Sequence, residues 1–249
     1  MSEPNLVVRD AGDGVAIVLL NRPDVLNAIT AELARDYAAA LRRLDADETV
    51  LAIVVSGAGR GFCSGADLSL LGGDVDALRR AVPARADLPS TSLAPTTPVI
   101  TAANGPVAGI GLAYLLGSDV RFADPAAKIA PVFPRLGLVA EYGLSWLLPR
   151  LVGLSAATDI LLSGRTITGA EAGAIGLVQY VSAPGEVLNE ATAYARKIAV
   201  TCSPWSIAMM KSQLAADLSR DYETALSHSL ELMDASFGRD ELQERIAAL

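Results

Sequence analysis

The sequence predicts an α/β fold in which buried strands alternate with helices. An uninterrupted apolar run, Leu51–Val55, has the composition of a strand that is buried on both faces. A second run of this kind covers residues 98–103. The segment that precedes the first run begins at Thr30, a favourable N-cap, and carries apolar residues at three-to-four spacing, which is typical of a helix with one buried face. These residues are Leu33, Tyr37, Leu41 and Leu44.

Composition narrows the class of protein. The chain has 249 residues, of which 51% are hydrophobic and 19% charged, so it can bury a sizeable core. Its net charge is −8, and no basic stretch is present, which argues against a nucleic-acid partner. The first residues show no basic and apolar leader, and the longest apolar run, near Val107–Leu116, is short for a bilayer. We therefore expect a cytoplasmic protein without a membrane partner.

The remaining elements follow in order. Residues 6–8 and 15–20 are expected to form a hairpin around Gly12-Asp13-Gly14, and residues 119–123 another strand. Residues 71–98 are rich in Ala, Pro, Asp and Arg and indicate a surface insert. Helices are expected over 143–151, 170–174, 190–200, 206–216 and 222–249. The shift to helices predicts a core over 1–191 and a helical C-terminal region over 192–249.

Two glycine-rich segments, residues 57–67 and 104–111, each follow a buried strand and lead toward a helix. Glycine lets backbone N–H groups approach a ligand and adopts positive φ without steric strain. Two such N–H groups that face one point form an oxyanion hole. The same pattern is also expected of two tight strand–helix turns, and the residues alone do not separate the two interpretations.

Several other sites are disfavoured. The segment after Gly57 lacks the third glycine of a dinucleotide fingerprint, since Phe62 stands there. The one histidine, His228, lies in an expected surface helix, which argues against a Ser–His triad and against a histidine-rich metal site. Cys63 and Cys202 are far apart in the sequence. We expect no metal and no redox cofactor. Phe62 and Trp146 are expected in the core.

Residues 56–68, which read Ser-Gly-Ala-Gly-Arg-Gly-Phe-Cys-Ser-Gly-Ala-Asp-Leu, resemble the signature of the crotonase (enoyl-CoA hydratase/isomerase) superfamily. Four further stretches agree with that family in order and spacing, and the resemblance extends from about Val15 to Glu244. These stretches are Leu20–Pro23 with Leu26–Ala28, Asn104–Gly111 to Asp119, Gly164 to Val178, and Pro204 with Ala208 and Lys211.

The resemblance implies a core of repeated ββα units in a spiral, with a helical C-terminal region that forms a homotrimer or a dimer of trimers. It implies an acyl-CoA thioester as substrate, with coenzyme A as part of the substrate rather than a separate cofactor. By position, the backbone N–H groups of Ala66 and Ile110 would form the oxyanion hole, although the family usually has glycine at the second position. The residues expected to contact CoA or substrate are Val25, Leu26, Ala28, Ser64, Ala66, Asp67, Leu68 and Gly109.

The acid and base positions depart from the family's hydratases. Those enzymes use two glutamates, which would fall at Ala113 and Phe133. Glu141 instead matches the segment in which some isomerases of the family place a single catalytic acid. The resemblance therefore implies that Glu141 shifts a 3-enoyl-CoA double bond to the 2-position, an isomerase or lyase type of reaction in fatty acid metabolism. Glu141 is also compatible with a first-turn helix glutamate that has no catalytic role, and Asp67 with a loop-fixing role.

Two alternatives stay open. One is an enoyl-CoA hydratase that adds water to a 2-enoyl-CoA with Glu141 alone or with water chains. The other is a protein that binds acyl-CoA without catalysis, which the loss of both family glutamates motivates. The sequence does not reveal the length or branching of the acyl chain, the pathway, or the choice between trimer and hexamer. The family's basic C-terminal tail is missing here, so the contacts to the CoA phosphates are not assigned.

Overall fold

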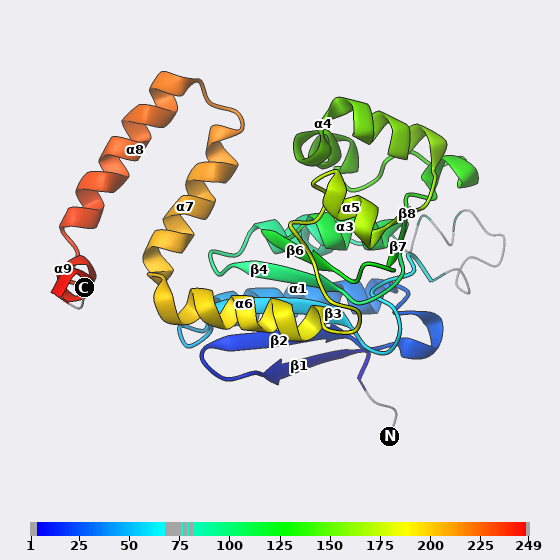
Figure 1. The fold of residues 1–249 in the computed structure, drawn as a ribbon, viewed down its shortest axis with the longest axis horizontal. Helices are drawn as coiled ribbons and strands as arrows, with labels where there is room; N and C mark the ends of the chain where they lie inside the picture. The colour runs from blue at the N-terminus through cyan, green and yellow to red at the C-terminus, as the bar shows by residue number, and fades with distance from the viewer. Residues whose placement is uncertain (1–3, 68–75, 77–78, 80–81, 248–249) are drawn as a thin grey trace.

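A six-stranded sheet forms the centre of the molecule (Figure 1). The computed structural model describes residues 4–67, 76, 79 and 82–247. The order of the strands is β1-β2-β3-β4-β6-β9, and all neighbours are parallel except β1 and β2. Their bounds are β1 Leu6–Asp10, β2 Val15–Leu20, β3 Ala52–Gly57, β4 Val99–Ala103, β6 Val120–Ala123 and β9 Tyr180–Val181. The expected strands and the hairpin at residues 12–14 are therefore confirmed.

Helices cover the sheet and extend beyond it. The α-helices are α1 Ala31–Asp45, α3 Ile110–Leu116, α4 Leu144–Ser163, α5 Gly169–Ala174, α6 Val187–Thr201, α7 Pro204–Asp217, α8 Tyr222–Phe237 and α9 Asp240–Ala247. Short 3-10 turns are η1 Pro23–Val25, η3 Arg85–Asp87, η4 Pro89–Leu93 and η5 Phe133–Leu136. Thr30 caps α1 as expected, with its Oγ1 accepting the Leu33 N–H at 3.1 Å. Residues 71–75, 77–78 and 80–81 of the expected insert over 71–98 lie outside the described residues, and its later part contains η3 and η4.

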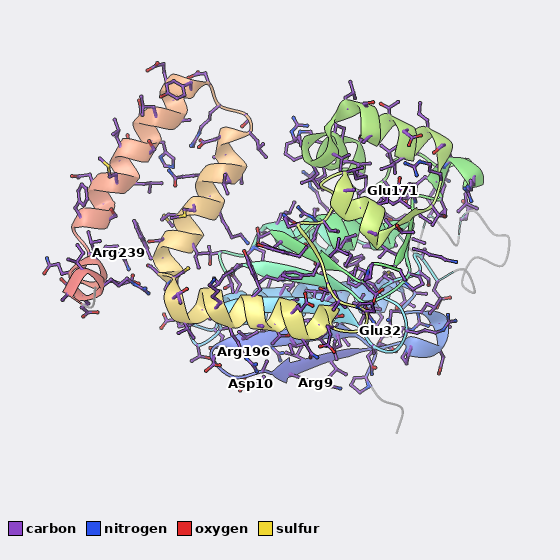
Figure 2. All side chains as sticks on the ribbon, viewed as in Figure 1. Arg9, Asp10, Glu32, Glu171, Arg196 and Arg239 are labelled. Atoms are coloured by element: carbon purple, nitrogen blue, oxygen red, sulfur yellow. The ribbon has the colours of Figure 1, made fainter. Side chains whose placement is uncertain are left out.

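The two faces of the sheet bury alternate residues of the same strands, as the pleat requires. Ile53 and Val55 of β3 face a core that includes α1, α3 and α4. Ala52 and Val54 face a second core, which α6 covers. The predicted division of the chain at residues 191 and 192 falls within α6. Arg196 of α6 also reaches the hairpin between β1 and β2, where it donates to the Ala11 carbonyl (Figure 2).

A small second sheet stands beside the first. It has the order β5-β7-β8, with β5 Val107–Ala108, β7 Lys128–Ala130 and β8 Ile167–Thr168. An isolated parallel bridge joins Cys63 to Val107, and another joins Ile29 to Ala66. These bridges bring the two glycine-rich segments and the segment before α1 to one place, beyond the ends of β3 and β4.

The α4 helix is apolar and bent. By length and composition alone, it is the one helix in the described part of the chain that passes for a membrane span, a test that core helices also pass. Gly153, with φ of 74° and ψ of 161°, breaks it into two shorter arms, so neither arm reaches the roughly 20 residues that a bilayer requires. The expectation that Trp146 lies in the core was wrong. This residue is 45% exposed, because it sits on the outer face of the first arm under the Arg150 guanidinium.

The last three helices extend from the body as an arm (Figure 1). They confirm the expected C-terminal helices, and no residue of α7, α8 or α9 is buried. Lys211 of α7 ties the arm to the sheet by donating to the Asp119 carboxylate at 2.6 Å and to the Thr97 carbonyl at 3.1 Å. Asp119 also accepts the Val99 N–H at 2.7 Å, so one side chain connects β4 to the arm.

Candidate active site

The two glycine-rich segments meet at Gly65 and Gly109. A methyl group added to Gly109 would lie 3.8 Å from the Gly65 Cα, and one added to Gly65 would lie 3.1 Å from the Ala108 carbonyl oxygen. Both glycines have positive φ, 109° for Gly65 and 52° for Gly109. This conformation strains most other residues. The close approach therefore favours glycine at position 65, and the positive φ favours glycine at both positions.

The direction of the Ala66 N–H follows from its neighbours. Ile29 donates its N–H to the Gly65 carbonyl at 2.8 Å and accepts the Asp67 N–H at 2.9 Å. In a trans peptide the N–H points opposite to the carbonyl, so the Ala66 N–H faces away from Ile29. Among the described residues, it has no hydrogen-bond acceptor. It is available to a ligand.

The Ile110 N–H is available for a different reason. It belongs to the first turn of α3, where no preceding helical carbonyl can accept it. The carbonyl of Gly109, in the same peptide, accepts the Leu112 N–H at 3.0 Å. The N–H therefore points away from the helix, and no acceptor for it occurs in the described part of the chain. Ile110 as a whole is 5% exposed, and its side chain belongs to the core.

Close packing sets where α3 begins. A methyl group added to Gly111 would lie 2.5 Å from the Cys63 carbonyl oxygen and 3.1 Å from its Sγ. Only a glycine allows α3 to approach the signature segment this closely. Burial raises the pKa of the Cys63 thiol to about 12, so this cysteine is a neutral packing group and not a nucleophile.

Glu141 lies on the loop between η5 and α4. Its side chain is partly buried, and burial raises the pKa of its carboxyl above the ordinary value. Its carbonyl accepts the Leu144 N–H at 3.0 Å, at the start of α4. Tyr142 follows with φ of 53°, a left-handed conformation that is unusual for tyrosine. Burial and the charge of Glu141 raise the pKa of Tyr142 to about 12, so this hydroxyl stays protonated.

The loop that carries Glu141 is joined to α3 through Tyr142. The Tyr142 side chain packs on the core that includes Ile110 and Cys63. It also lies close enough to Tyr114 of α3 to contribute to the raised pKa of that phenol. Upstream, the Ala130 carbonyl accepts the Gly109 N–H at 3.2 Å. The segment from β7 to α4 therefore runs from Gly109 past α3 to Glu141.

The two positions of the family's hydratase glutamates are apolar and enclosed. Ala113 on α3 and Phe133 at the start of η5 are each 2% exposed. Both belong to the same core as Ile110. Neither position offers a group that can carry a proton.

The other residues expected at the site lie around the signature segment. Ser64 donates its N–H to the Leu26 carbonyl at 2.9 Å and its Oγ to the Val25 carbonyl at 3.0 Å. The Ala28 carbonyl accepts from Arg22 at 2.6 Å, and Asp67 is paired with the same arginine. Leu68 lies outside the described residues. No group of three or more His, Cys, Asp or Glu residues that could hold a metal occurs among the residues described.

Arg22 and Asn27 are polar residues whose contacts the sequence did not predict. Asn27 is fully buried, with φ of 58°, and its side chain accepts the Arg22 N–H and donates to the carbonyls of Ala58 and Gly61. Both lie in the early stretch that carries the family resemblance. The signal in the sequence that could have indicated these contacts is that Arg22 and Asn27, two polar residues, flank the short turn η1.

This architecture and the stretches that build it define the class of protein. The family model for enoyl-CoA hydratase/isomerase matches residues 10–248, and the chain belongs to this family. It is 30% identical over 254 residues to a short-chain-enoyl-CoA hydratase of Clostridium acetobutylicum, covering 99% of this chain and 95% of that one. It is 31% identical over 238 residues to the 1,2-epoxyphenylacetyl-CoA isomerase of Escherichia coli, a match that covers 87% of this chain and 88% of that one.

Solved structures agree with the fold. The crystal structure of an enoyl-CoA hydratase from Bacillus anthracis superposes with a TM-score of 0.92 at 26% identity, over 98% of this chain and 95% of that chain. The expected crotonase-type α/β fold is confirmed, and the chain is an enzyme of the enoyl-CoA hydratase/isomerase type.

Proposed function

We propose that the protein shifts the double bond of a 3-enoyl-CoA to the 2-position, with Glu141 as the single base. The observation that carries this proposal is the distribution of carboxylates. Both positions at which the family's hydratases carry glutamate are buried apolar residues, Ala113 and Phe133, while Glu141 is a partly buried carboxyl with a raised pKa. One carboxylate suffices for isomerisation, because the same group can remove a proton at one carbon and return it at another.

The proposed reaction has two proton transfers. The Glu141 carboxylate removes a proton from C2, next to the thioester carbonyl. The electron pair of that C–H bond moves into the conjugated system, and the carbonyl oxygen becomes the negative oxygen of a dienolate. The N–H groups of Ala66 and Ile110 donate to this oxygen. The protonated Glu141 then delivers its proton to C4, the double bond settles between C2 and C3, and the carboxylate is restored.

The site's electrostatics suit this sequence. A raised carboxyl pKa makes Glu141 a stronger base than an exposed glutamate and brings its affinity for a proton closer to that of the carbon acid. Each donor to the developing oxyanion is worth about 10²–10³ in rate. Val25, Leu26, Ala28, Ser64, Asp67, Leu68 and Gly109 are proposed to contact CoA or substrate, and the active assembly is proposed to be a homotrimer or a dimer of trimers.

The first experiment offers the purified protein a 3-enoyl-CoA and a 2-enoyl-CoA separately and identifies the products by chromatography and mass spectrometry. Conversion of the 3-enoyl-CoA to an isomer of equal mass, without water addition, is the expected result. Addition of water to the 2-enoyl-CoA would instead favour the hydratase activity that the name of the Clostridium relative describes.

The second experiment replaces the base. Glu141→Gln keeps the size of the side chain and removes its basicity, so isomerisation should fall by at least about 10³-fold while acyl-CoA binding, measured by calorimetry, is kept. Glu171→Gln is the matched control, because Glu171 pairs with Arg165 on the surface of α5 (Figure 2). Full activity of Glu141→Gln would contradict the proposal. Binding without turnover of any enoyl-CoA by the unaltered protein would favour the non-catalytic alternative.

A further inference from the structure

The Arg22 guanidinium joins two segments of the candidate site. Its Nη2 donates to the Asp67 carboxylate at 2.8 Å, and its Nη1 donates to the Ala28 carbonyl at 2.6 Å. The two side chains are largely enclosed, with 7% of Asp67 and 20% of Arg22 exposed. A charged pair that is shielded from water in this way interacts more strongly than a surface pair.

The two acceptors of Arg22 are next to the two residues of the bridge that directs the Ala66 N–H. Ala28 precedes Ile29, and Asp67 follows Ala66. Ile29 and Ala66 face one another across the backbone bridge that directs the Ala66 N–H. The guanidinium therefore spans this bridge, from the Ala28 carbonyl on one segment to the Asp67 carboxylate on the other. A planar fork of N–H donors is suited to holding two acceptors at a set separation.

The backbone of Arg22 is held in place by the side chain of Asn27. Its backbone N–H donates to the Asn27 Oδ1 at 2.8 Å, and the Asn27 Nδ2 donates to the Ala58 carbonyl at 3.0 Å and the Gly61 carbonyl at 2.8 Å. Leu26 and Asn27 both have left-handed φ, a strained conformation that persists only where surrounding contacts enforce it. The turn that carries Arg22 is thus anchored to the loop after β3, upstream of Ala66 on the same segment.

We propose that Arg22 is a positioning residue of the oxyanion hole, which acts through Asp67 and Ala28 to set the direction of the Ala66 N–H. This inference rests on the proposed role of that N–H, but not on which base or reaction the site uses. Arg22 touches neither substrate nor the reacting atoms in this assignment. Its effect is geometric: a backbone donor that turns or shifts by a fraction of an ångström loses much of its interaction with the oxyanion.

Arg22→Lys tests the proposal. Lysine keeps the positive charge but presents a single ammonium group, which cannot hold the carboxylate and the carbonyl with a planar fork. In the full-length protein, kcat should fall by about 10-fold or more while KM changes by less than about 3-fold. Arg165→Lys is the matched control, because Arg165 also bridges two acceptors, Asp159 and Glu171, but on the surface. Its kcat should equal that of the unaltered protein.

A spectroscopic measurement separates positioning from general stability. Butyryl-CoA with a 13C-labelled thioester carbonyl is bound to each variant, and the carbonyl stretch is recorded by infrared difference spectroscopy. A donor aimed at the oxygen lowers this frequency. The unaltered protein, Arg165→Lys and Glu141→Gln should show the lowered frequency, and Arg22→Lys should lose most of the shift. Because Glu141→Gln keeps the donors, this result does not depend on the identity of the base.

The outcomes are distinct. An unchanged frequency and kcat in Arg22→Lys would overturn the proposal, as would a lower melting temperature with an unchanged frequency, since that is the signature of a purely structural pair. If Arg22→Lys does not fold, the carbonyl frequency in Asp67→Asn decides the question: this variant keeps the side-chain shape and removes the charge that pairs with Arg22, so the frequency should lose part of its shift, and an unchanged frequency would overturn the proposal. No frequency shift in the unaltered protein would overturn the oxyanion hole itself, whereas inactivity toward 3-enoyl-CoA with a normal shift would overturn only the proposed reaction.

Discussion

The two glycine-rich segments present their N–H groups in different ways. The Ala66 segment is held by polar contacts: a backbone bridge to Ile29, the Ser64 hydroxyl and the Arg22–Asp67 pair. The Ile110 segment also has backbone hydrogen bonds, from Ala108 and Gly109, but the start of α3 is set by close packing, with Gly111 against Cys63 and the Ile110 side chain in the core. Both arrangements leave a backbone N–H without an acceptor in the described part of the chain. Equivalent donors can therefore depend on different forces and should fail under different changes.

Among changes to the two glycine-rich segments, the largest expected effect comes from disrupting the packing of Gly111. The methyl group added in Gly111→Ala would lie only 2.5 Å from the Cys63 carbonyl oxygen, so α3 must move away from the signature segment. The Ile110 N–H moves with it, and kcat should fall by about 100-fold. The melting temperature should also fall, because the core around α3 is densely packed.

Stopped-flow kinetics and a thermal melt on the same preparation check this prediction. Gly238→Ala is the matched control for an added methyl group, because that methyl would lie 3.7 Å from its nearest atom, the Ala235 carbonyl oxygen, which is an ordinary contact. Gly238 lies between α8 and α9, outside the candidate site, and the kcat of this variant should be close to that of the unaltered protein. A Gly111→Ala enzyme with normal kcat would show that the start of α3 tolerates displacement.

Lowering the pH should affect the base, Glu141, but not the backbone N–H donors. Burial raises the pKa of Glu141, and only its ionised form can take a proton, so kcat/KM should fall tenfold per pH unit below that pKa. The midpoint should lie above about 4.3, the value of an exposed glutamate. The backbone N–H groups do not titrate, so the lowered carbonyl stretch of bound butyryl-CoA should persist across the same range.

The same pKa shift has a consequence for stability. In the folded state Glu141 holds its proton more tightly than in the unfolded chain, so stability is lost as the pH rises through the folded pKa. Glu141→Gln removes this effect and should be at least as stable as the unaltered protein at pH 7. A midpoint for the loss of kcat/KM at low pH that lies at or below the pKa of an exposed glutamate would contradict the assignment of Glu141 as a partly buried base.

The smallest expected effect compares one hydroxyl from each segment. The buried Tyr114 hydroxyl on α3 has no hydrogen-bond partner among the described residues, and Tyr114→Phe should raise the free energy of unfolding by about 1 kcal/mol. The Ser64 hydroxyl donates to the Val25 carbonyl, and Ser64→Ala should lower it by about 1 kcal/mol. Urea titrations of both variants measure the difference. A loss of stability in Tyr114→Phe would show that α3 also depends on polar contacts.

Much of the fold follows from local patterns. The apolar runs of β3 and β4, the capped helix after Thr30 and the hairpin at residues 12–14 each depend on neighbouring residues, and each is confirmed. The signature around residues 56–68 predicted the family, which the family model confirms. Trp146 was placed wrongly because an apolar helix does not show from its sequence which face is covered once Gly153 bends it.

The residue types can be read from the chain alone: two glycine-rich segments, a carboxylate at 141 and apolar residues at 113 and 133. Folding is what brings Gly65 and Gly109 together, turns the Ala66 N–H away from Ile29, and places Arg22 across the bridge between Ile29 and Ala66. The reason is physical. Chemistry is carried by single residues, but the direction of the Ala66 N–H depends on contacts between residues that lie from 36 (Ile29 and Gly65) to 45 (Arg22 and Asp67) positions apart, which no local pattern specifies.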